Sequence, residues 1–132
     1  NRSNEEVLKQ LHARGIGTMT YGSLGSGILT GAIRELPNFA PNDTRVSFYD
    51  YFKEPKFSSI MKLLKQMDEI GENRHVPLAQ IALNWSTQKD YVDTAICGVS
   101  KPAQAIQNCA AASWELTAEE LAFLNEAIAK YA

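Results

Sequence analysis

Two short apolar segments, separated by helix-like sequence, constrain the fold of this chain most. Residues 16–21 and 91–99 are rich in β-branched and aromatic residues, which predicts two strands. Between them, residues 58–70 and 77–88 carry apolar side chains at helical spacing, and Gly71 is expected to stop the first of these helices. Because strands joined through helices must run parallel, we expect an α/β fold with two parallel strands and open sheet edges.

Further helices are predicted before the first strand and after the second. Ser3 or Asn4 is placed to cap a helix at the start of the chain, and residues 102–112 form a helix that begins at a proline. Thr117 followed three residues later by Glu120 is a capping-box pattern for a last helix. The long segment 32–55 is predicted to be irregular, and its aromatic residues give part of it something to pack with.

Composition and charge exclude several classes of protein. Hydrophobic residues make up 45% of the 132 residues, which is enough to bury a core. The net charge of −2 argues against a nucleic-acid partner, and no stretch is apolar enough to span a membrane. The polar first residues show no secretory signal, so we expect a cytoplasmic protein.

The two cysteines do not indicate a metal site. Cys97 and Cys109 are not part of a zinc-ligand spacing, so no metal is predicted. We interpret them as buried cytosolic thiols, while a disulfide between them stays open.

The segments that follow the two strands have the composition of ligand-binding loops. Residues 22–31 read GSLGSGILTG, and glycines allow main-chain N–H groups to approach a phosphate. Residues 98–108 read GVSKPAQAIQN, in which a helix N-terminus beside Lys101 suits an anion. Loops after parallel strands are where α/β folds bind ligands. Taken alone, the first segment is equally consistent with a flexible connector, and the second with ordinary helix capping.

Four motifs in order resemble the aldo-keto reductase family. The sequence GIGTMTYGSLGSGILTG at 15–31 is similar to the family's seventh-strand region, and QIALNW at 80–85 to the helix that follows. ICGVSKPAQAIQN at 96–108 resembles the eighth-strand region, and residues 114–124 resemble a WxLTxEExxxL pattern. The resemblance implies a (β/α)₈ TIM barrel, which takes about 250 residues. We therefore expect a partial TIM barrel, with residues 1–132 as its C-terminal part and last two β/α units.

The resemblance implies an oxidoreductase that reduces aldehydes or ketones to alcohols with NADP as cofactor, NAD being possible. The family's catalytic Tyr, Lys, Asp and His belong to strands that this chain lacks. No catalytic residue is therefore assigned, and the chain alone is expected to be inactive. The residues implied to contact the cofactor are Tyr21 on the nicotinamide; Gly22, Leu24, Ser26 and Gly27 along the nicotinamide and pyrophosphate; Gly98, Ser100, Lys101 and Gln104 around the adenosine ribose; and Gln107 and Asn108 at the adenine.

Departures from the family pattern leave the choice of nucleotide open. Gly22 and Ser23 stand where the family usually has Ser and Pro, and Ser100 stands where it often has an Arg against the 2′-phosphate. Lys101 supplies a charge there without the bidentate geometry of arginine, so NADP is only favoured over NAD. Arg45 either closes over the cofactor or is a solvated loop charge.

Two other functions are compatible with the sequence. One is a non-catalytic nucleotide-binding or scaffolding subunit, since some members of the resembled family serve mainly as partners of other proteins. The other is an inactive fragment, whose exposed strand edges are expected to drive self-association or domain swapping. The substrate is not indicated, because most of the βα loops that set it in a barrel are missing.

Overall fold

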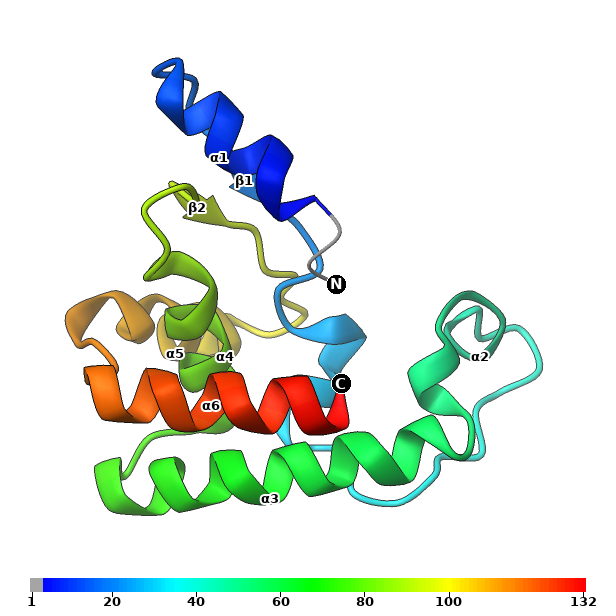
Figure 1. The fold of residues 1–132 in the computed structure, drawn as a ribbon. Coiled ribbons are helices and arrows are strands. Elements are labelled where there is room, and N and C mark those ends of the chain that lie inside the picture. The colour runs from blue at the N-terminus through cyan, green and yellow to red at the C-terminus, as the bar shows by residue number, and fades with distance from the viewer. Residues whose placement is uncertain (1–3) are drawn as a thin grey trace.

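The computed structural model describes residues 4–132, in which a small parallel sheet lies beside a group of helices (Figure 1). Along the chain the elements are α1 (Glu5–Ala13), β1 (Met19–Thr20), η1 (Gly25–Thr30), α2 (Arg45–Phe48), η2 (Asp50–Phe52), α3 (Lys56–Arg74), α4 (Leu78–Thr87), β2 (Thr94–Ala95), α5 (Pro102–Cys109), η3 (Ala110–Ser113) and α6 (Ala118–Tyr131), where η denotes a 3₁₀ helix. In the described part of the chain, each helix is too short or too polar to cross a membrane.

The two strands pair in parallel, which confirms the predicted direction. Met19 lies opposite Thr94 and Thr20 opposite Ala95. Beyond the last pair, the main-chain N–H of Ile96 donates to the carbonyl oxygen of Thr20 at 2.7 Å. The helical connection between β1 and β2 therefore returns the chain in the direction that the predicted order of elements requires.

The strands are shorter and more exposed than predicted. Only two residues of each predicted segment pair, and the expectation of a buried first strand is wrong, because Met19 is 71% and Tyr21 88% exposed. Thr18 is the buried residue of this segment, and its N–H donates to the Asp93 carboxylate at 2.7 Å. Burial of a parallel strand needs covering elements on both faces, and this chain supplies few of them.

The core lies among the helices rather than at the sheet. α3 and α6 run antiparallel side by side (Figure 1), and α4 packs against α3. The Ser59 hydroxyl donates to the carbonyl oxygen of Tyr131 at 2.7 Å, which joins the start of α3 to the end of α6. The buried stripe confirms the predicted periodicity and includes Ile60, Leu63, Leu64, Met67, Ile81, Leu124 and Ala127.

α3 continues past the glycine that was expected to stop it. The helix runs from Lys56 to Arg74, and Gly71 lies buried within it. A Cβ on Gly71 would lie 3.0 Å from the main-chain oxygen of Val76, so the glycine permits close packing instead of ending the helix. His75 follows the last helical residue with a φ of 54°, and the Val76 N–H donates back to the Gly71 carbonyl oxygen at 3.0 Å. The prediction of a stop at Gly71 is therefore wrong, because the left-handed residue that ends the helix is His75.

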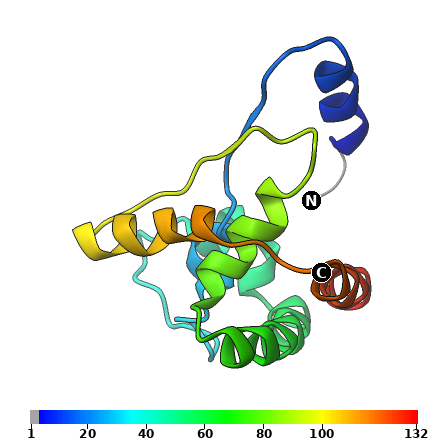
Figure 2. The ribbon, with the colours of Figure 1, turned by 90° about the vertical axis from the view of Figure 1, so that its left-hand side faces the viewer.

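Helix ends follow the predicted signals at α6 but not at α1. The Glu120 N–H donates to Thr117 Oγ1 at 3.2 Å and the Thr117 N–H donates to Glu120 Oε2 at 2.7 Å, which confirms the capping box. Asn4 precedes α1 without a side-chain capping bond, and Ser3 lies outside the described residues. Figure 2 shows α1 standing apart from the α3–α6 layer, and none of its residues is buried.

The segment 32–55 is less irregular than predicted. The segment contains α2 and η2, and its aromatic rings pack as expected: the Phe39 and Phe52 centroids are 5.1 Å apart.

Both cysteines are free thiols, but Cys97 is only half-buried and Cys109 is exposed. The interpretation of two buried thiols is therefore wrong for Cys109, which is the last residue of α5.

Candidate functional site

The parallel register brings the two glycine-containing loops to the same edge of the sheet. Because β1 and β2 run in the same direction, the chain leaves both strands at one edge. The bond from the Ile96 N–H to Thr20 fixes the two exits beside each other. The segments 22–31 and 98–108, far apart in the sequence, therefore start from neighbouring positions.

The glycine-rich segment is an ordered turn. Ser26 and Gly27 have positive φ angles of 51° and 95°, which interrupt the 3₁₀ helix η1. The Thr30 hydroxyl donates to the Gly27 carbonyl oxygen at 2.7 Å, and the Gly27 N–H donates to the Leu24 carbonyl oxygen at 3.0 Å. The Ser23 hydroxyl is buried and has no hydrogen-bond partner among the described residues. A buried polar group without a partner is costly, so the Ser23 hydroxyl is an unusual feature of this loop.

The residues of this loop differ in what they face. Tyr21 is 88% exposed, and a Cβ on Gly22 would meet no atom within 4 Å, so both border open space. Leu24 is half-buried and packs against the hydrophobic core. The structure thus leaves the Tyr21 ring and the Gly22 main chain accessible, whereas the Leu24 side chain is turned inward.

The N-terminus of α5 is capped by its own glutamine. Gln104 Oε1 accepts from the Ser100 N–H at 2.8 Å, the Lys101 N–H at 3.1 Å and the Ser100 hydroxyl at 3.1 Å. These are donors of the kind that hold an anion at a helix N-terminus. Lys101 is exposed beside them, and Gly98 borders open space. The three donors therefore converge on one acceptor, the Gln104 amide oxygen, which accepts the hydrogen bonds that an anion would accept there.

The other end of α5 is more buried. Asn108 is 8% exposed, and its Nδ2 donates to Cys97 Sγ at 3.6 Å. Gln107 has an exposed side chain, and its main-chain oxygen accepts from Gln80 Nε2 at 2.9 Å. Of the two residues implied to meet the adenine, Gln107 is on the surface and Asn108 faces inward toward Cys97.

The 39–52 segment lies against the glycine-rich loop. Burial raises the pKa of the Tyr51 hydroxyl, and a side-chain hydrogen bond with Ser26 opposes that increase. Arg45 Nη2 donates to Asp43 Oδ2 at 2.5 Å, and its guanidinium lies 4.1 Å from the Phe39 ring centroid. The Arg45 hydrogen bonds lower the pKa of Asp43 below its ordinary value. In this structure Arg45 is thus held by Asp43 and Phe39.

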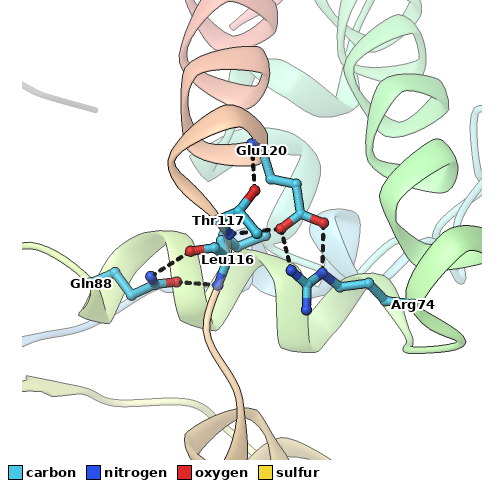
Figure 3. Close-up of polar contacts among 5 residues, drawn as sticks. All are labelled: Arg74, Gln88, Leu116, Thr117 and Glu120. Atoms are coloured by element: carbon cyan, nitrogen blue, oxygen red, sulfur yellow. Dashed lines mark hydrogen bonds and ion pairs between the residues drawn. The ribbon is translucent and has the colours of Figure 1, made fainter.

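A polar clamp joins the ends of α3 and α4 to the start of α6 (Figure 3). Arg74 Nε and Nη2 donate to the two oxygens of Glu120 at 2.6 and 2.7 Å. The Arg74 hydrogen bond lowers the pKa of Glu120 below its ordinary value. Gln88 bonds the backbone of Leu116 twice, donating to its oxygen at 3.0 Å and accepting from its N–H at 2.8 Å.

Sequence reasoning missed the buried glutamine that connects this region to α5. Gln80 is 7% exposed, and it bonds both Gln107 and Trp114. The signal was present, because a polar residue amid the apolar positions 78–83 of α4 needs a partner. The two histidines, His12 and His75, are both exposed. Within residues 4–132 there is no group of three His, Cys, Asp or Glu side chains that could hold a metal ion.

Comparison with known proteins decides the family. The profile described as "Aldo/keto reductase family" matches residues 1–129. The chain belongs to the aldo/keto reductase family. Aldo-keto reductase str7 of Strobilurus tenacellus is 31% identical over 116 residues, 88% of this chain and 34% of that protein. Aldo-keto reductase YhdN of Bacillus subtilis is 29% identical over 122 residues, 92% of this chain and 37% of that protein.

Further relatives broaden the picture. A Schizosaccharomyces pombe protein named for a role as a voltage-gated potassium channel subunit beta is 31% identical over 123 residues, 90% of this chain and 35% of its own. The glycerol dehydrogenase AKR11B4 from Gluconobacter oxydans superposes with a TM-score of 0.86 at 22% identity, covering 98% of this chain and 39% of that structure. The chain thus spans about a third of the length of the aldo/keto reductases it matches.

The shared fold confirms the expectation from the sequence. The two parallel strands and their helices form part of a (β/α)₈ barrel of the aldo/keto reductase type. In such barrels ligands bind at the carboxyl ends of the strands, which is the edge where the segments 22–31 and 98–108 leave the sheet.

Proposed function

We propose that this chain supplies the cofactor-binding loops of an NAD(P)H-dependent reductase that converts aldehydes or ketones to alcohols. The single observation that supports this best is that two loops rich in hydrogen-bond donors leave the sheet side by side, at the carboxyl ends of β1 and β2. The second loop has donors that suit a dinucleotide, because the Ser100 and Lys101 N–H groups converge on one acceptor. We extend this assignment to residues 1–132 as the C-terminal part of the barrel.

Each group of residues would have a separate task in holding the nucleotide. The exposed Tyr21 ring offers a flat face for the nicotinamide, which supplies the hydride when the cofactor is bound. Gly22 and Gly27 let the main chain approach the pyrophosphate beside Ser26. Gly98, Ser100, Lys101 and Gln104 border the adenosine ribose, and Gln107 and Asn108 the adenine. Proton delivery needs a positioned acid, which we place outside this chain, so the chain alone would be inactive.

Lys101 is the residue on which we base the preference for NADP over NAD. Lys101 is exposed and directly follows Ser100, whose N–H lies at the start of α5. Its ammonium would hold a 2′-phosphate by charge, without bidentate geometry. An exposed pair of this kind contributes about 1 kcal/mol or less, or about fivefold in affinity. We also propose a cytoplasmic location, which suits two free thiols.

The test is to titrate the chain and its Lys101→Met variant with NADPH and, separately, with NADH, and to monitor binding by NMR. We expect weak binding of both by the chain, and a loss of about fivefold for NADPH alone in the variant. Lys65→Met, on the exposed face of α3, is the matched control for loss of one positive charge. Absence of nucleotide binding by both the chain and its longer parent would overturn the proposal, and equal losses for NADPH and NADH would remove the role of Lys101.

The similarity to the potassium channel subunit supports a second candidate, a non-catalytic nucleotide-binding subunit. The remainder of the parent sequence separates the two candidates. Intact Tyr, Lys, Asp and His at the family's catalytic positions favour the reductase, and their loss favours the subunit.

An inactive fragment is the third candidate, and it predicts self-association. Ile16, Met19, Ile96 and Val99 are exposed along the two strand segments, and among residues 4–132 neither outer edge of the two-stranded sheet pairs with a further strand. Light scattering on the purified chain should then show dimers or larger species. A monodisperse monomer would contradict this expectation.

A further inference from the structure

Gln80 is a buried polar residue whose two ends hold different elements. Its side chain is 7% exposed and projects from α4 between apolar neighbours. Nε2 donates to the main-chain oxygen of Gln107 at 2.9 Å, and Oε1 accepts from Trp114 Nε1 at 2.9 Å. Burying a carboxamide is costly unless both ends are paired, so this arrangement fixes the positions of its two partners.

The bond to Gln107 anchors the end of α5 that the loop does not hold. α5 has eight residues, and a helix this short is marginal in isolation. Its first turn is held by Gln104, which accepts from Ser100 and Lys101. Gln107 lies in the last turn, where helix carbonyl groups need additional partners. Gln80 therefore secures α5 against α4 independently of the N-terminal cap.

The bond to Trp114 links the same side chain to the clamp of Figure 3. The Trp114 ring lies 5.1 Å from the Arg74 guanidinium, which in turn binds both oxygens of Glu120. One carboxamide thus joins α5 to the residues that hold α3 and α6 together. Its two partners, Gln107 and Trp114, lie on opposite sides of η3 in the sequence.

We propose that Gln80 is a positioning residue for the nucleotide: through the Gln107 main chain it sets the orientation of α5, and with it the donors at Ser100 and Lys101. This inference rests on the proposed function, because it assigns α5 to the adenosine half of the cofactor. Gln80 itself makes no contact with the ligand. Loss of its carboxamide weakens nucleotide binding by loosening α5, and leaves the donors themselves unchanged.

The experiment compares Gln80→Met with Gln88→Met. Both changes remove a glutamine of the α4 region that makes two hydrogen bonds, but Gln88 makes both of them to the main chain of Leu116, outside α5. The first readout is native-state amide exchange by NMR, residue by residue along α5. The second is the affinity of the same samples for NADPH, repeated in the longer parent protein.

We expect Gln80→Met to speed exchange in α5 about tenfold beyond its effect on the rest of the chain, and to weaken NADPH binding by a similar factor. In Gln88→Met, α5 should exchange in step with the rest of the chain. Equal changes in α5 for both variants would overturn the proposal, and so would loosening of α5 without loss of affinity. If unmodified protein binds no nucleotide, the proposed function fails, whereas the exchange comparison still judges whether Gln80 holds α5.

Discussion

Replacing Glu120 by glutamine should destabilise the chain through the clamp between α3 and α6. Glu120 accepts three hydrogen bonds from charged or main-chain donors, two from Arg74 and one from Thr117. A glutamine keeps one acceptor oxygen and turns a donor toward the other site, so at least one of these bonds breaks. A hydrogen bond to a charged group contributes about 1.5–3 kcal/mol.

Partial exposure reduces the expected cost. The side chains of Arg74 and Glu120 are 29% and 21% exposed, so solvent screens the pair to some degree. We therefore expect the free energy of unfolding to fall by about 1–2 kcal/mol, which for a chain of this length lowers Tm by about 4–8 °C. Thermal unfolding followed by circular dichroism measures both quantities. Glu119→Gln, an exposed change in the same first turn of α6, is the matched control for the interaction with the helix dipole.

The pH dependence gives an independent check. Arg74 holds the folded-state pKa of Glu120 below its ordinary value of 4.5. The stabilisation is therefore fully present above pH 4.5 and is lost as the pH falls through the lowered folded-state pKa. The stability difference between Glu120→Gln and the unmodified chain should shrink over that range. Equal destabilisation by Glu119→Gln and Glu120→Gln, or a difference that persists in acid, would refute the reasoning.

Two further changes test the packing around the site. Leu64→Ala removes a fully buried side chain and should cost about 2–5 kcal/mol, measured as a lower urea midpoint, whereas a small effect would show that the core collapses around the gap. Gly31→Ala should cost about 1–3 kcal/mol, because φ is 75° and the added Cβ would lie 3.1 Å from Leu78 Cδ2. Gly22→Ala has a similar φ of 73° but open space, so the excess loss for Gly31→Ala reports crowding, and equal losses would contradict it.

Local patterns predicted the elements whose causes are local. The Thr117–Glu120 capping box forms as its spacing indicates, and the stripe of α3 faces the core. The parallel pairing of β1 and β2 also followed from the order of elements. These outcomes depend on side-chain spacing and chain connectivity, both of which can be read from a sequence.

Features that depend on which groups become partners in the fold were not predicted. The strand lengths and the exposure of Met19 follow from which elements cover the sheet. Gly71 stays helical because the left-handed residue that closes α3 is His75, after which the Val76 N–H donates back to the Gly71 oxygen at 3.0 Å. The amide oxygen of Gln104 gathers the Ser100 and Lys101 donors, and Gln80 holds α5; both are choices of hydrogen-bond partner. The residues were visible in the sequence, whereas their partners required the fold.

The short sheet has a consequence for the order in which the chain folds. The bond from Thr18 to Asp93 closes a loop of 75 residues, and closing such a loop costs about 4 kcal/mol in chain entropy. Each hydrogen bond of the two-residue strands returns only about 1 kcal/mol. Pairing therefore becomes favourable only after α3 and α4 have shortened the intervening chain. The edge that carries both loops is then the last part of the chain to form and the first to open. Under the proposed function, nucleotide binding and local unfolding would therefore compete for the same residues.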